Sequence, residues 1–174
     1  LAPAAPGGTN DRMVSFVDFA PTVLSLAGLD LPAHFQGTAS LGAKAAAPRG
    51  FIFGGKDRQG ECADTIRYVR DHRFQYLRNF QPHLPYGQFM SYNWQHASTP
   101  VWEQLHRAGK LSGPPARFFA ATKPVEELYD VQRDPWQINN LAADPVYAAE
   151  LIRLRTLLAA QMEAASDLGL LPER

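Results

Sequence analysis

A leucine repeat near the end of the chain predicts a long amphipathic helix. Its apolar residues recur at three- and four-residue spacing, which places them on one helical face: Leu151, Leu154, Leu158 and Met162. Pro145 stands where a helix begins without losing a backbone hydrogen bond, and residues 146–166 continue the pattern. Because such a helix must bury its apolar face, the rest of the chain has to supply a surface for it.

A β-hairpin is the predicted source of that surface. Residues 64–70 and 73–78 are rich in β-branched and aromatic side chains, and Asp71 and His72 lie between them as a two-residue turn. This turn pairs apolar residues across the strands: Val69 with Phe74, and Ile66 with Leu77. Glu126–Tyr129 adds a further short strand. The sequence therefore predicts a small antiparallel sheet packed against the terminal helix.

Between these elements lies a segment rich in aromatic residues. Residues 80–98 contain five aromatic rings among two prolines and a glycine, a composition typical of an ordered loop that packs on its own side chains. Thr99 then caps a predicted short helix over residues 101–108, which Gly109 ends. The aromatic loop and the short helix are both expected to serve as packing elements.

The first fifty residues follow a different pattern. Residues 1–8 are rich in proline, alanine and glycine and are expected to form a connector. Met13–Val17 is a predicted strand, and Asp18 caps a predicted helix over Phe19–Ala27 that stops at Gly28. Strand followed by helix indicates an α/β unit. Residues 31–50 then lead to a short strand at Phe51–Phe53, which Gly54 and Gly55 end.

Composition excludes several classes of function. The 174 residues include 17 basic and 17 acidic side chains, so no global field favours a nucleic acid or an anionic membrane. No apolar run has the roughly 18 residues that a membrane span requires. The single cysteine excludes an internal disulfide, which leaves the compartment open between a bacterial periplasm and the cytoplasm.

Arginines alternate with aromatic residues along the predicted hairpin, a pattern also found on surfaces that bind single-stranded nucleic acid. The residues concerned are Arg67, Tyr68, Arg70, Arg73, Phe74, Tyr76, Arg78 and Phe80. The glycine-containing RNA-recognition signature is missing, however, and the apolar cross-strand pairs indicate a covered sheet. Arginine stems packed over aromatic rings explain the pattern better.

Lys56 and Arg58 are the candidate binding residues. They follow the predicted strand Phe51–Phe53, at the position where open α/β sheets gather ligand-binding groups. An ammonium group and a planar guanidinium suit sulfate or phosphate. The alternative is an ordinary solvated surface loop. The five histidines have no metal-ligand spacing with an acid or a cysteine, so no metal site is predicted.

Three segments together resemble the end of a sulfatase. Met13–Gly28 resembles a segment near the end of the family's main domain, Arg67–Asn79 its C-terminal hairpin, and Glu127–Leu141 its closing motif. The resemblance covers about residues 7 to 165, and the stretch His83–Gly87 is similar to bacterial members close to the heparan N-sulfatase group. The family belongs to the alkaline phosphatase superfamily.

The resemblance implies a formylglycine nucleophile, made from a Cys/Ser-x-Pro-x-Arg motif, and a calcium ion. Cys62 lacks the proline and the arginine of that motif. Ser112 has the proline, but Ala116 occupies the arginine position and Arg117 comes one residue late. No catalytic or metal-binding residue of the family is therefore assigned to this chain, and both cofactors are expected upstream in the complete enzyme.

We therefore predict an α/β fold in the form of an α+β fragment. Residues 1–50 would be the last strand-helix unit of the sulfatase α/β domain with its connector, and residues 51–174 the C-terminal subdomain with its antiparallel sheet, aromatic loop and terminal helix. The expected partner is the N-terminal part of the same enzyme, and the chain by itself is expected to be inactive.

Other interpretations stay open at this point. The chain would also suit a non-catalytic binding or structural module derived from such a domain, or the end of a related phosphonate or phosphate ester hydrolase. Within the sulfatases, the substrate would be an aryl sulfate, a sulfated sugar or an N-sulfated sugar, with Lys56 and Arg58 as the substrate-binding residues.

Overall fold

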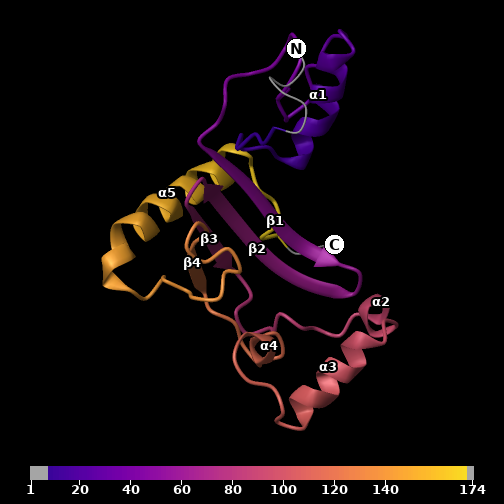
Figure 1. Ribbon diagram of the computed structural model, residues 1–174, viewed down its shortest axis with the longest axis vertical. Coiled ribbons are helices and arrows are strands. Elements are labelled where there is room, and N and C mark those ends of the chain that lie inside the picture. The colour runs from indigo at the N-terminus through magenta and orange to yellow at the C-terminus, as the bar shows by residue number, and fades with distance from the viewer. Residues whose placement is uncertain (1–7, 172–174) are drawn as a thin grey trace. The chain divides into compact units, whose positions relative to one another are not determined.

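The computed structural model describes residues 8–171, so most of the predicted connector lies outside the described residues. The chain divides into two compact units. The first contains the chain up to Phe53 together with Arg70–His72, and the second contains Gly54–Val69 and the chain from Arg73 onward. Figure 1 labels the elements of each unit.

The first unit is built on a short helical segment. The helix α1 spans Phe19–Leu26 and ends before Gly28, whose φ of 73° confirms the predicted stop. The predicted strand at Met13–Val17 is wrong, because residues 13–15 are irregular and Phe16–Asp18 form the 3₁₀ helix η1. The cause is Asp18, whose carboxylate accepts the Ser15 amide at 2.8 Å and turns the chain there.

Asp18 does not cap α1 through its side chain as the sequence suggested. It is 1% exposed, and its Oδ1 accepts the Thr38 amide at 2.8 Å and an Arg49 guanidinium nitrogen at 2.7 Å. Burial alone would raise the pKa of Asp18, but the hydrogen bonds from Ser15 and Thr38 and the pairing with Arg49 outweigh it and lower the pKa. Asp18 thus ties α1 to the connection that follows it.

The sheet has four strands in the order β1-β2-β3-β4. They span Phe51–Gln59 (β1), Cys62–Asp71 (β2), Phe74–Asn79 (β3) and Glu126–Asp130 (β4). The turns between the first three strands are two residues long, which requires antiparallel neighbours, and β3 pairs antiparallel with β4. The predicted antiparallel sheet is confirmed.

The predicted turn of the hairpin is displaced by one residue. It lies at His72 and Arg73, and the Phe80 amide donates to the Thr65 carbonyl at 2.9 Å, where the predicted pairing would have placed Arg78. Moving the turn by one residue changes each cross-strand partner by two residues, which leaves every side chain on the same face of the sheet. The apolar pattern therefore cannot distinguish the two registers.

Strand β1 is longer than predicted, because Gly54 and Gly55 do not end it. A side-chain carbon on Gly54 would collide with the Tyr68 ring, and one on Gly55 would lie 2.8 Å from Arg67 Cδ. The two glycines make room for large side chains on β2 instead of breaking the strand. Consequently Lys56 and Arg58 lie within β1 and not in a loop after it.

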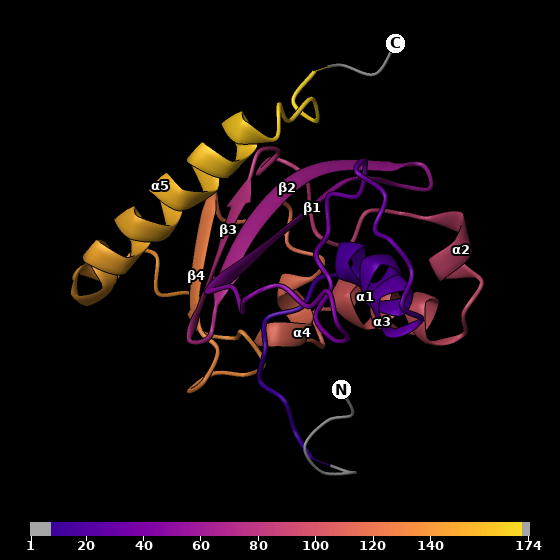
Figure 2. The same cartoon turned by 90° about the horizontal axis from the view of Figure 1, so that it is seen from above.

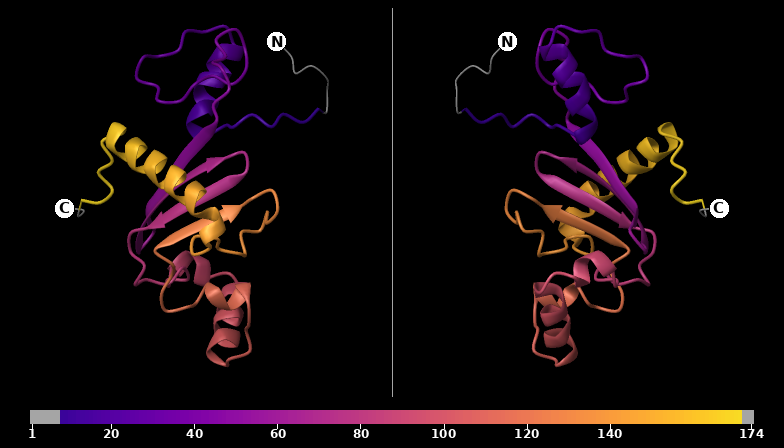
Figure 3. Two further views of the ribbon diagram at one scale, coloured as in Figure 1. Left: turned by 90° about the vertical axis from the view of Figure 1, so that its left-hand side faces the viewer. Right: turned by 90° about the vertical axis from the view of Figure 1, so that its right-hand side faces the viewer.

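The long terminal helix is confirmed. The 3₁₀ helix η2 spans Pro145–Tyr147 and continues as α5 over Ala148–Ala164, with Leu151, Leu154 and Leu158 buried. Figures 2 and 3 show α5 alongside one face of the sheet. None of the helices within residues 8–171 is long and apolar enough to cross a bilayer.

Three short helices lie between β3 and β4. They span Ser91–Trp94 (α2), Ser98–Arg107 (α3) and Pro114–Arg117 (α4). Helix α3 begins one residue before Thr99, so the predicted cap is wrong, whereas its end before Gly109 is confirmed by a φ of 66°. Residues 80–125 contact the face of the sheet opposite α5 through the polar contacts described below.

Candidate functional site

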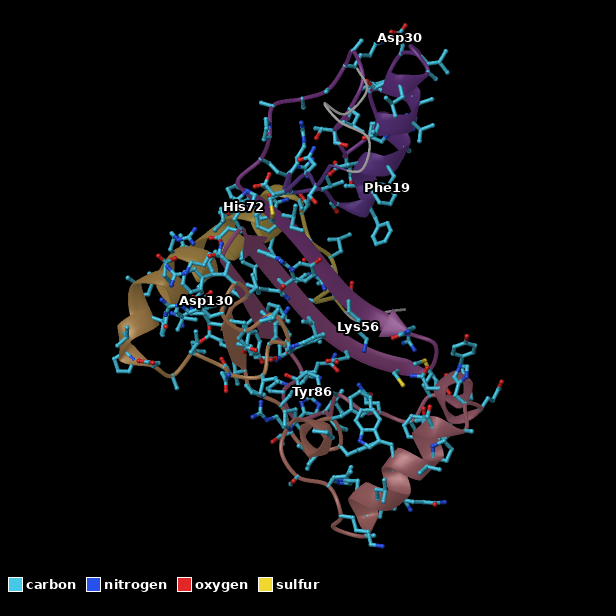
Figure 4. All side chains as sticks on the ribbon, viewed as in Figure 1. Phe19, Asp30, Lys56, His72, Tyr86 and Asp130 are labelled. Carbon is cyan, nitrogen blue, oxygen red and sulfur yellow. The ribbon has the colours of Figure 1, made fainter. Side chains whose placement is uncertain are left out.

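Lys56 and Arg58 lie on the edge strand β1, near its end, and Figure 4 labels Lys56 there. Because side chains alternate along a strand, these two project from one face and Asp57 from the other. Lys56 is half-buried and Arg58 is exposed. Arg58 also lines a cavity of about 470 Å³ together with Asp57 and Leu170, and Lys56 does not line it. The structure thus places both predicted residues on one strand, two positions apart.

A buried ion pair stands beside Lys56. Lys123 and Asp64 are both almost fully buried, and the Lys123 ammonium donates to Asp64 Oδ1 at 2.6 Å. The Lys56 ammonium lies 3.8 Å from Asp64 Oδ2. Two ammonium groups therefore share one carboxylate, which leaves one net positive charge at this position. The sequence analysis missed Lys123 and Asp64, because nothing in the sequence near either residue indicates its partner.

A second buried carboxylate lies on the same face. Glu127 accepts hydrogen bonds from the hydroxyls of Tyr86 and Tyr129 and, at 2.6 Å, from the Asn79 amide nitrogen. Burial raises the pKa of both tyrosine hydroxyls, and the Glu127 carboxylate raises them further. The tyrosines therefore remain protonated donors, and their hydrogen bonds to Glu127 position the aromatic loop.

The Glu127 cluster forms one wall of a cavity of about 1090 Å³. Its other walls carry the rings of Trp102 and Phe118 and the side chain of Arg117. The Arg117 guanidinium donates to the Ile138 carbonyl, which ties α4 to the turn after β4. This hydrogen bond holds the turn in place.

On the opposite face of the sheet, Arg67 binds the Asp167 carboxylate, which follows α5. Its guanidinium donates to Asp167 at 2.5 and 2.8 Å and lies 2.8 Å from an Asp57 oxygen. The hydrogen bonds to Asp167 raise the pKa of Arg67 against the opposing effect of its burial, and Asp57 adds to them. The same pairing with Arg67 lowers the pKa of Asp167 to about 2.

The ion pair between Asp167 and Arg67 predicts a loss of stability in acid. A carboxylate whose pKa is lowered on folding stabilises the protein above its unfolded pKa, and this contribution is lost as the pH falls through the folded value. The window here runs from about pH 4 down to about pH 2. As the pH falls through that window, the unmodified chain should lose about 1 kcal/mol of unfolding free energy through Asp167, after allowance for solvent screening. Asp167→Asn should not show this loss, because asparagine does not titrate.

Urea unfolding at a series of pH values measures this effect. Asp57→Asn is the matched control, because Asp57 contacts the same guanidinium but its side chain is half exposed. An Asp167→Asn profile that parallels the unmodified chain between pH 4 and pH 2 would contradict the assignment.

The two residues that partly match the formylglycine motif have structural surroundings. Cys62 is buried, and its thiol donates to the Phe89 carbonyl at 2.9 Å, while Ser112 is exposed in the loop before α4. Within residues 8–171, no three Asp, Glu, His or Cys side chains come together as a group that would hold a metal ion. The described residues therefore do not fit the calcium site of a sulfatase.

Comparison with known proteins finds sulfatases. No protein-family model matches the chain. An ulvan-active sulfatase of Formosa agariphila is 37% identical over 165 residues, which cover 95% of this chain and 28% of the relative. Human N-sulphoglucosamine sulphohydrolase is 26% identical over 88% of this chain and 33% of its own length.

Solved structures show the same fold. A 2-O GAG sulfatase matches 87% of this chain and 25% of its own, with a TM-score of 0.56 and 22% identity. The chain thus spans between a quarter and a third of the length of the proteins that it matches. Its homologues are sulfatases, and the chain corresponds to their C-terminal part.

Proposed function

We propose that this chain works as the C-terminal segment of a longer sulfatase that hydrolyses sulfate groups on a carbohydrate. The match to the ulvan-active sulfatase over 95% of the chain carries the proposal. The printed names of the relatives favour a sulfated sugar over a simple aryl sulfate, since they refer to ulvan and to N-sulphoglucosamine.

The chemistry of the reaction divides the work between this segment and the rest of such an enzyme. Hydrolysis of a sulfate ester needs a nucleophile, a cation to activate it, and positive groups that neutralise charge on the sulfate oxygens in the transition state. The described residues supply neither the nucleophile nor the metal site. The basic residues of β1 are the contribution that this segment can make.

Lys56 and Arg58 are our proposed contacts to the sulfate or to the sugar that bears it. They lie two residues apart on one face, so their Cα atoms are separated by roughly 6–7 Å, which suits two contacts to one anionic sugar. Because Lys123 already balances the charge of Asp64, the Lys56 ammonium keeps a net positive charge to offer. Arg58 adds a planar donor fork.

The test is alanine substitution of Arg58 in the longer enzyme. Loss of one charge-assisted hydrogen bond costs about 1.5–3 kcal/mol, so kcat/KM for a sulfated oligosaccharide should fall by about 10- to 100-fold. Arg107→Ala is the matched control and should have no effect, since Arg107 is an exposed arginine paired with Glu103 on α3.

The 174-residue chain by itself serves as the blank and should show no turnover. Unchanged kcat/KM and unchanged substrate preference in Arg58→Ala would exclude Arg58 from the substrate site. Turnover that follows the purified 174-residue chain would overturn the assignment of the chemistry to the rest of the enzyme.

A further inference from the structure

Helix α1 has its polar side inward and its apolar side outward. Its exposed arc consists of apolar residues alone: Phe16 from η1, and Phe19, Ala20, Val23, Leu26 and Ala27. Each large side chain of this set is more than half exposed, and Figure 4 shows the Phe19 ring projecting away from the helix. The opposite arc contains the buried residues Asp18, Pro21 and Ser25. This distribution is the reverse of an ordinary surface helix.

Hydrogen bonds fix the helix in this orientation. Thr22 Oγ1 accepts the Ser40 amide at 2.9 Å, and Ser25 Oγ accepts the Lys44 amide at 3.0 Å. Asp18 holds Thr38 in the same way. Rotating α1 to bury its apolar arc against its own connection would break all three contacts. The outward apolar face is therefore built into the local structure.

We infer that this apolar arc, which we call the α1 stripe (Phe16, Phe19, Ala20, Val23, Leu26 and Ala27), docks on an apolar β-sheet face in the part of the enzyme that precedes this chain. The inference rests on the proposed function, because it takes the chain to be the end of a longer sulfatase. Helices with one apolar stripe and no charge within it pack on sheets in α/β domains.

The lengths of the relatives favour this occupant over a second copy of the chain. The relatives match the chain through their C-terminal part, and they are about three times as long, so most of their sequence precedes the matched segment. An exposed apolar patch of this kind marks an interface.

The experiment places one charge in the stripe. Val23→Asp is made both in the 174-residue chain and in the longer enzyme. Val23 is exposed here, and valine and aspartate have similar helix propensities, so the change should leave the helical circular dichroism of the 174-residue chain unaltered. In the longer enzyme the same charge would be buried without a partner, and Tm should fall by more than about 5 °C.

Val146→Asp is the matched control. Val146 is an isolated exposed valine at the start of η2, outside the first unit, and its substitution should change Tm by less than about 1 °C in both proteins. An equal response to Val23→Asp and Val146→Asp in the longer enzyme would overturn the inference. A dimer of the 174-residue chain in light scattering that Val23→Asp dissociates would assign the stripe to self-association instead.

The two proposals fail separately. If the longer enzyme has no sulfatase activity but Val23→Asp still lowers its Tm selectively, the docking surface stands and the proposed function falls. If the enzyme is active and Val23→Asp behaves like the control, the docking surface falls alone.

Discussion

Replacing Lys123 by methionine is expected to lower the unfolding free energy of the chain by about 3–5 kcal/mol, because it removes one partner of a buried ion pair. The Lys123 ammonium is fully buried and lies 2.6 Å from Asp64. Without it, the Asp64 carboxylate stays buried with Lys56 as its remaining cation, at 3.8 Å. Lys56 is partly exposed, so we place the effect toward the lower end of that range.

Urea unfolding followed by tryptophan fluorescence measures this loss, since the three tryptophans of the chain lie in the second unit with Lys123. Lys56→Met is the matched control and should cost no more than about 1 kcal/mol, because that pair is longer and partly solvated.

The double variant Asp64→Leu/Lys123→Met separates a lost pair from a lost side chain. Replacing both charges by apolar groups of similar volume should recover most of the stability. A double variant as unstable as Lys123→Met would show that the packing of the lysine stem, and not the stranded carboxylate, accounts for the loss.

Periodic patterns predicted the elements of the second unit well. The repeat through Leu151, Leu154 and Leu158 predicted the terminal helix, and β-branched and aromatic residues predicted β2 and β3 nearly in full. These predictions succeeded because helix and strand periods depend on residues close together in the sequence.

The errors share a different origin. Gly54 and Gly55 look like strand breakers, and only their contacts with side chains of β2 explain why β1 continues through them. Asp18 looks like a helix cap, but its partners Thr38 and Arg49 lie 20 and 31 residues away. The Asp64–Lys123 pair spans 59 residues. Contacts between distant residues decide these features, and a single sequence does not reveal them.

The same limit applies to the candidate site. The sequence identified Lys56 and Arg58 by their charge and by their place after a strand, and the structure moves both into the strand itself. Residue type alone could not show that Lys56 shares Asp64 with a buried lysine. That shared carboxylate is the feature that determines how much positive charge the face carries.

Replacing Leu154 by alanine is the second large effect that we expect, with a loss of about 3–5 kcal/mol in unfolding free energy. Leu154 is fully buried in the middle of α5, where its removal leaves a cavity that the surrounding residues fill only in part. Ile152→Ala on the same helix is the matched control, since Ile152 is more than half exposed and should cost less than about 1 kcal/mol.

The loss should decrease toward the end of the helix. Met162 is half-buried and lines an existing cavity of about 400 Å³ beside Tyr76 and Glu126, so less packing is lost when its side chain is shortened. We expect Met162→Ala to cost about 1 kcal/mol, well below Leu154→Ala, in the same urea experiment. Equal losses for Leu154, Ile152 and Met162 would contradict the packing of α5 on the sheet, because that packing predicts a separate value for each position.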